Sequence, residues 1–171
     1  NALTGTWFKV NIGTNAIEVP EADGKMRFWH NTSVANLSPG QTATLSDFTL
    51  GYEWDEEPDN GFRPAGLIRM STTSVNDAVV LLDYGSSYAV GSATHNLTLY
   101  KHSSGALVFG AGTVQWSWGL DGNHDRLAST PDVRMQQATV NLFADMGVQP
   151  GTLQSNLVPA TQSTDVTAPT S

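Results

Sequence analysis

The sequence predicts an α+β fold, in which a β-dominated mixed sheet packs against one main helix near the carboxyl end. Short apolar runs with alternating polarity recur between Thr6 and Leu120, and turn residues separate them. Only residues 132–146 show apolar positions at helical spacing. The chain has 171 residues, of which 39% are hydrophobic, and this is enough for one domain with a buried core.

Several strands are expected along the first part of the chain. Residues 6–10 and 17–19 alternate apolar and polar side chains on either side of the turn IGTNA, which predicts a hairpin. The further strand patterns are residues 25–29, 42–50, 67–73, 78–82 and 96–100.

A central strand is expected in residues 106–120, ALVFGAGTVQWSWGL. Gly110 and Gly112 allow a bend within it, and Trp116 and Trp118 at positions i and i+2 are expected on one face. A polar loop follows at once with the titratable residues Asp121, His124, Asp125 and Arg126. Functional groups often sit on such loops, because a rigid element positions them.

The expected helix spans residues 132–146. Thr130 is expected to cap its amino end, Pro131 fits the first helical position, and Gly147 fits a left-handed carboxyl cap. The helix should pack against the sheet, beside the strands of residues 108–118. After Pro150 the sequence becomes polar and rich in Pro and Thr, so we expect a domain of residues 1–150 and a linker of residues 151–171 toward an immunoglobulin-like module.

The amino-acid composition limits the binding partners and the cellular locations that this protein can be expected to have. The formal net charge is −8, and nucleic acid is an improbable partner because a basic stripe for phosphates is missing. The chain has no cysteine, which excludes disulfides, thiolate metal sites and a cysteine nucleophile. No apolar run approaches the roughly twenty residues that span a bilayer. Low charge, abundant Ser and Thr and the lack of cysteine suit a secreted or cell-surface bacterial protein, although a cytosolic chain could look similar.

The densest group of chemical side chains is GYEWDEEPDNGFRPAG, residues 51–66. Glu53 lies between Tyr52 and Trp54, and a carboxylate against aromatic walls has a raised pKa that suits a general acid or base. The alternative is that Glu53 pairs with Arg63 and that the remaining acids form a solvated turn; these are Asp55, Glu56, Glu57 and Asp59. Calcium binding by residues 55–60 stays open, but Pro58 interrupts the EF-hand pattern.

The four histidines form no HxxxH or HExxH pair, so spacing alone predicts no metal site. His95 precedes the alternating strand NLTLY and is the histidine that could point into a pocket, whereas His124 is equally a plain loop residue. No GxSxG elbow and no glycine-rich phosphate loop is present. The five tryptophans permit a second interpretation, in which Trp116 and Trp118 form a sugar-stacking platform, unless that face is buried as core.

Four runs carry a resemblance to a known family: GKMRFWHNTSVANL, LGYEWDEEPDNGFRPAGLIR, ATHNLTLYKHSSGALVFGAGTVQWSWGLD and DVRMQQATVNLFADMGVQP. They resemble the carboxyl-terminal part of the large (beta) subunit of N,N-dimethylformamidase-like proteins, over nearly the whole chain from Ala2 to about Val158. The resemblance implies an amidohydrolase with a domain similar to class I glutamine amidotransferases and one iron held by two tyrosines and a glutamate. It also implies that the fold of this chain is similar to the carboxyl-terminal part of a class I glutamine amidotransferase-like fold.

The family's HDEYW-type motif, which would carry the glutamate ligand, has no counterpart here, so the resemblance places the iron ligands upstream and assigns no metal ligand and no cofactor to this chain. Glu53 is the residue matched to an acidic family residue near the metal. We therefore expect Glu53 and His95 as catalytic residues and four aromatic residues as the substrate-binding wall: Tyr52, Trp54, Trp116 and Trp118.

Two functions of different classes follow. The first is the carboxyl-terminal segment of a formamidase-like amidohydrolase, which would act on a small amide and be inactive alone. The second is a noncatalytic extracellular module that binds glycan or builds a surface layer. In both, the expected partners are the preceding and following domains of the same polypeptide, with no nucleic acid and no membrane span.

Overall fold

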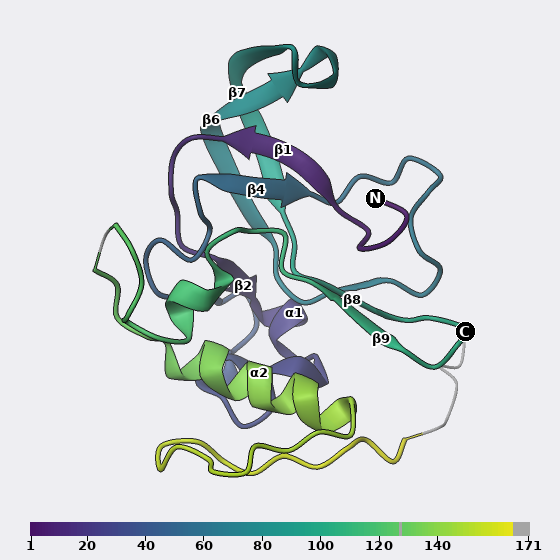
Figure 1. The fold of residues 1–171 in the computed structure, drawn as a ribbon, viewed down its shortest axis with the longest axis vertical. Helices are drawn as coiled ribbons and strands as arrows, with labels where there is room; N and C mark the ends of the chain where they lie inside the picture. Colours follow the sequence, from purple (N-terminus) through teal and green to yellow (C-terminus); the bar gives the residue numbers. More distant parts are fainter. Residues whose placement is uncertain (127, 166–171) are drawn as a thin grey trace.

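The computed structural model describes residues 1–126 and 128–165. Three antiparallel sheets lie above a helical layer (Figure 1). The four-stranded sheet has the order β4-β1-β6-β7, and the smaller sheets are β2-β3 and β5-β8-β9. The strands are β1 (Trp7–Asn11), β2 (Glu18–Pro20), β3 (Thr42–Thr44), β4 (Glu53–Glu56), β5 (Ile68–Arg69), β6 (Thr73–Leu82), β7 (Ser87–His95), β8 (Thr98–Lys101) and β9 (Leu107–Gly110).

The helical layer contains a short helix, α1 (Glu21–Gly24), and the main helix, α2 (Val133–Asp145). Four 3-10 turns complete the described elements: η1 (Arg27–Trp29), η2 (Ser33–Asn36), η3 (Asp83–Gly85) and η4 (Trp116–Gly119). The α+β class with one main helix is confirmed. The sheets are not mixed, however, because every strand pair in the described residues is antiparallel.

The expected hairpin between residues 6–10 and 17–19 is wrong. β1 pairs with β4 and β6, whereas β2 pairs with β3. The chain turns away between them, since Ile12 adopts a left-handed φ of 78° and donates its amide to the Tyr52 carbonyl at 2.6 Å. Long-range pairing therefore replaces the local turn that the sequence pattern suggested.

Two expected strands are 3-10 turns instead. Residues 25–29 contain η1, which buries Phe28 and Trp29, and residues 116–119 form η4. Within residues 42–50 only the first three residues form a strand, β3. In a 3-10 turn, side chains two residues apart do not share a face. Trp116 and Trp118 therefore form no platform: Trp118 is buried, and Trp116 packs on Phe109 with ring centroids 5.5 Å apart.

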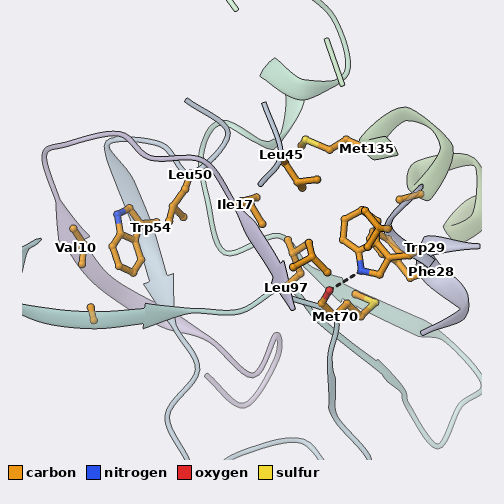
Figure 2. Packing of buried hydrophobic residues seen from close by; sticks show 14 of the residues in the cluster. Val10, Ile17, Phe28, Trp29, Leu45, Leu50, Trp54, Met70, Leu97 and Met135 are labelled. Carbon is orange, nitrogen blue, oxygen red and sulfur yellow. Dashed lines mark hydrogen bonds between the residues drawn. The ribbon is translucent and has the colours of Figure 1, made fainter. Parts of the chain in front are cut away.

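The core lies between the sheets and α2 (Figure 2). Trp29 is fully buried, and its indole Nε1 donates to the Met70 carbonyl oxygen at 2.7 Å. Met135 of α2 joins the same cluster. α2 packs against η1 and η4 rather than beside a long strand of residues 108–118. Gly119 of η4 allows this approach, because a Cβ there would overlap the Met135 side chain.

The helix itself was predicted well, except for its amino-terminal cap. Asp132, and not Thr130, is the capping residue, since its carboxylate accepts the Arg134 amide at 2.9 Å. Pro131 consequently precedes the cap instead of opening the helix. Gly147 has a φ of +79°, as expected for the residue that follows a helix.

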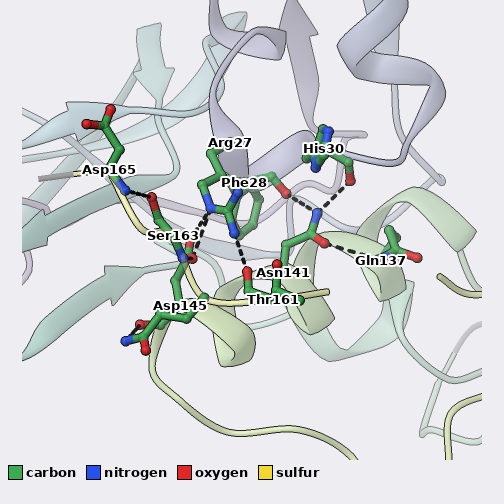
Figure 3. A network of polar contacts seen from close by, with 10 residues as sticks. Arg27, Phe28, His30, Gln137, Asn141, Asp145, Thr161, Ser163 and Asp165 are labelled. Carbon is green, nitrogen blue, oxygen red and sulfur yellow. Dashed lines mark hydrogen bonds and ion pairs between the residues drawn. The ribbon is translucent and has the colours of Figure 1, made fainter. Parts of the chain in front are cut away.

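The segment after Pro150 has no regular secondary structure, yet it runs along α2 (Figure 3). The Gln137 side-chain amide exchanges two hydrogen bonds with the Val158 backbone, at 2.7 and 2.9 Å. The Arg27 guanidinium binds the Thr161 carbonyl and the Asp145 carboxylate. Residues 158–163 are thus held against the helix. No helix among the described residues is long and apolar enough to cross a bilayer.

Candidate functional site

The acidic segment of residues 51–66 contains β4, and successive side chains of this strand point to opposite faces of the sheet. Trp54 points into the core and is 1% exposed. Glu53, its neighbour on the strand, therefore points to the opposite face and is half-buried. Among the described residues the Glu53 carboxylate has no hydrogen-bond or ion-pair partner. It is therefore an unpaired, half-buried carboxylate on a strand.

Arg126 contacts Tyr52, the residue that precedes β4. Its guanidinium carbon lies 4.2 Å from the centre of the Tyr52 ring, and its Nη2 lies 3.4 Å from the Tyr52 hydroxyl. The loop after η4 thereby reaches the residue that precedes Glu53. Sequence spacing gave no signal for this contact, because the two residues are far apart in the chain. The Arg126 guanidinium thus adds a cationic group to the Tyr52 side of this segment.

The acidic turn is only partly solvated. Glu57 is 5% exposed, and its carboxylate lies 3.0 Å from Arg63 Nε and 2.6 Å from Arg69 Nε. The alternative pairing of Glu53 with Arg63 is therefore wrong, and so is the solvated state that this alternative gave Glu57. Because Glu57 is committed to two guanidinium groups, it orders the loop before β5 and is not available to a ligand.

His95 lies behind β4, on the Trp54 side. Its ring meets the Trp54 ring edge-on, with centroids 6.2 Å apart, and it is fully buried. Nε2 lies 2.8 Å from the Ala111 carbonyl, so the neutral ring carries its proton on Nε2. Nδ1 and the Trp54 Nε1 have no hydrogen-bond partner among the described atoms. Glu53 and His95 thus sit on opposite faces of β4 and are not brought together.

Burial lowers the pKa of His95 to about 4, although the hydrogen bond to Ala111 acts in the other direction. Between pH 6.5 and 4 the unfolded chain binds a proton that the folded chain does not bind. The free energy of unfolding should therefore fall by about 3 kcal/mol as the pH is lowered through this window. Urea unfolding at several pH values measures it. His95→Gln should flatten the slope there, and an unchanged slope in this variant would contradict the assignment.

Trp118 and His124 belong to a small network around the loop that follows η4. Trp118 is buried and stacks on the His124 ring, with centroids 4.1 Å apart and an angle of 13° between planes. His124 Nε2 also lies 2.7 Å from the Ser129 hydroxyl, which in turn donates to the Trp118 carbonyl. This small network holds the loop that carries Arg126. Sequence reasoning named His124 but missed Ser129, for which no motif gave a signal.

Trp7 is the tryptophan with the largest exposed fraction, 45%. It lies in a groove between β1 and the end of β6, and Tyr84 projects from η3 at the rim. The groove is lined by Trp7, Phe8, Lys9, Leu81, Leu82, Asp83, Tyr84 and Gly85. Aromatic surface with a few polar groups at its edge is a typical small-ligand surface.

The donors for a metal are dispersed. In the described part of the chain no three His, Cys, Asp or Glu side chains come together to hold an ion. The tyrosines are used elsewhere or lie apart: the Tyr100 hydroxyl donates to the Leu3 carbonyl, Tyr52 stacks with Arg126, and Tyr84 and Tyr88 are exposed on the β6–β7 hairpin. These residues do not form the site of two tyrosines and a glutamate that the resemblance implies for iron.

Fold and site together define an α+β domain whose described residues include unpaired carboxylates on β4, Glu53 and Glu56, but gather no metal ligands. Comparison with known families gives the family: the chain belongs to the N,N-dimethylformamidase beta subunit-like, C-terminal family, whose model matches residues 1–131. The match ends just before α2. No curated protein and no solved structure was found to match the chain.

Proposed function

We propose that this chain is the carboxyl-terminal segment of an amidohydrolase that acts on C–N bonds, and that Glu53 is its proton-transferring residue. Two observations support the proposal: the family membership of residues 1–131 and the free carboxylate of Glu53 on β4. The iron ligands of the family would then belong to a preceding part of the polypeptide, similar to a class I glutamine amidotransferase. The segment alone would be inactive.

In this proposal Glu53 holds or releases a proton at a carboxylate oxygen while an amide is cleaved. Arg126 stacks on Tyr52, the residue that precedes Glu53 in the chain, and would orient a polar substrate group, because a guanidinium offers several donors in a fixed plane. A carboxylate in such a role contributes about 10²- to 10⁴-fold to the rate.

His95, Trp54 and the other tryptophans would support the site from behind. His95 binds Ala111, and the next residues flank β4: the Gly112 carbonyl accepts the Asp55 amide at 2.7 Å, and the Glu53 carbonyl accepts the Val114 amide at 3.2 Å. We therefore assign His95 a positioning role for Glu53. Trp118 would act likewise, through His124 and the loop that carries Arg126.

The test is Glu53→Gln in the chain joined to the preceding part of its polypeptide. The amide isostere keeps size and shape but cannot exchange a proton, so kcat on a small formamide should fall about 10²-fold or more. Glu56→Gln is the matched control, since Glu56 is a half-buried acid of the same strand that has no polar partner within residues 1–126 and 128–165. Activity retained in Glu53→Gln, with unfolding unchanged, would overturn the proposal.

A noncatalytic glycan-binding module is the second candidate, and one observation favours it: the aromatic groove at Trp7. The original platform of Trp116 and Trp118 does not exist, so this groove would have to carry the sugar. Quenching of Trp7 fluorescence by oligosaccharides, absent in Trp7→Ala, would favour this role. Secretion, a bacterial source and a following immunoglobulin-like module stay proposals with it.

A further inference from the structure

The loop between β4 and β5 carries the pair Asn60 and Gly61, and no other asparagine of this chain is followed by glycine. Both residues are exposed. The loop lies beside the amino terminus (Figure 1), where Asn1 Nδ2 donates to the Asn60 side-chain oxygen at 3.2 Å. Water and base therefore reach the side chain of Asn60 and the peptide bond that follows it.

The side-chain carbonyl of Asn60 is polarised by two donors. Its Oδ1 accepts hydrogen bonds from the Phe62 amide and from Asn1 Nδ2, each at 3.2 Å. Donors on a carbonyl oxygen stabilise the negative charge that develops there when a nucleophile attacks the carbon. In the described part of the chain the Asn60 Nδ2 group donates no hydrogen bond, so nothing retains it as a leaving group. The side chain is thus an accessible electrophile.

The nucleophile is the backbone nitrogen of Gly61. This nitrogen has no hydrogen-bond acceptor among residues 1–126 and 128–165. Gly61 has a φ of +84°, and no heavy atom outside the adjacent residues lies within 4 Å of the position that a Cβ would take there. Glycine therefore leaves the approach to its own nitrogen open, which a side chain would narrow. Because this nitrogen and the Asn60 Cγ belong to adjacent residues, the attack is intramolecular and has a high effective concentration.

We propose that Asn60 is a site of spontaneous deamidation. The Gly61 nitrogen forms a bond to the Asn60 Cγ, and the bond between Cγ and Nδ2 breaks. The amide proton of Gly61 ends on the departing nitrogen, which leaves as ammonia. Water then opens the cyclic succinimide at either of its carbonyls and yields aspartate or isoaspartate at this position. The reaction needs only water and base, and it does not depend on Glu53 or on the amide cleavage proposed above.

The product changes the charge of a loop that ion pairs hold in place. One added carboxylate takes the formal net charge from −8 to −9. The new charge lies next to Asp59, whose carboxylate is 4.0 Å from Arg63, while Arg63 also binds the buried Glu57 at 3.0 Å. Isoaspartate in addition lengthens the main chain between Glu57 and Arg63 by one carbon atom. The modification therefore acts on the segment that Glu57 orders before β5.

Incubation of the intact chain at mildly alkaline pH, followed by peptide mass spectrometry, is the first test. The peptide that contains Asn60 should gain one mass unit, because an NH2 group is replaced by OH. Asn123 is the reference within the same chain, since it is exposed but is followed by His124, whose side chain narrows the approach. Asn60 should convert several times faster than Asn123. Equal rates at the two residues, or an unmodified Asn60, would overturn the proposal.

Two variants then separate this site from the rest of the chain. In Gly61→Ala the added methyl group should slow the conversion of Asn60 several-fold. Asn60→Gln should stop it, because the longer side chain would have to close a larger ring. On ion exchange the incubated wild type should show a new, more acidic species, and incubated Asn60→Gln should not. An acidic species of equal amount in Asn60→Gln would place the modification elsewhere and contradict the assignment.

Discussion

Replacing Trp29 by alanine is expected to remove most of the stability of this protein. The side chain is fully buried, and its ring meets the Phe28 ring edge-on, with centroids 4.8 Å apart. Deleting a buried tryptophan costs about 3–5 kcal/mol. The Met70 carbonyl would also lose its donor, at about 1–3 kcal/mol for an unsatisfied buried group. Domains of this size have about 5–15 kcal/mol in all, so a large unfolded fraction should result.

Urea unfolding followed by circular dichroism measures this effect. Trp7→Ala is the matched control, because Trp7 is a half-exposed tryptophan of the same protein. It should lower the free energy of unfolding by about 1 kcal/mol or less. Trp29→Phe should fall between the two, since it keeps an aromatic ring but not the donor to Met70. A Trp29→Ala variant as stable as Trp7→Ala would show that this cluster is not the core of the fold.

Asp132→Ala should have the second largest effect on stability, about 3–5 kcal/mol. The buried carboxylate of Asp132 caps α2, binds the Arg134 guanidinium at 2.6 Å and accepts the Ser46 amide at 2.9 Å. Its removal leaves the Ser46 amide and the Arg134 side chain without this acceptor. The hydrogen bond between Asp132 and the Ser46 amide joins α2 to a segment that is distant in the sequence. Thermal unfolding of Asp132→Ala should therefore show a larger loss of stability than the removal of an ordinary helix cap causes.

The same carboxylate makes the stability depend on acid. Burial by itself raises the pKa of Asp132, but the hydrogen bonds and charge of Arg134 outweigh it and hold the pKa below its ordinary value. The contribution of Asp132 is therefore complete above the ordinary pKa of 3.8 and is lost as the pH falls through the folded value. Asp125→Ala removes an exposed carboxylate and serves as the control. An equal loss in both variants would contradict the role given to Asp132.

Local sequence patterns predicted those elements that depend on local physics. α2 was found because its apolar residues repeat at helical spacing and Gly147 follows it. The β1 pairing was not found, because its partners β4 and β6 lie far away in the chain and alternation alone cannot choose between them. η4 was mistaken for a strand because tryptophans at i and i+2 satisfy a strand pattern as well as a 3-10 turn.

The candidate site was predictable only in its residue types. The crowding of aromatic and acidic residues at 51–66 singled out Glu53, and β4 does present that carboxylate unpaired. The role of Glu57 was missed, because its burial depends on Arg69, which comes from another part of the chain. The Arg126 contact with Tyr52 was missed for the same reason. Contacts between distant segments determine which of several acids stays free, and spacing does not encode them.

The central claim is that this segment contributes a proton-transfer group while the metal ligands reside elsewhere in the polypeptide. Iron analysis of the purified chain, incubated with ferrous iron without oxygen and then desalted, tests it most directly. We predict only traces of iron in the chain alone and stoichiometric iron once the preceding part is joined to it. One iron retained per isolated chain would contradict the account.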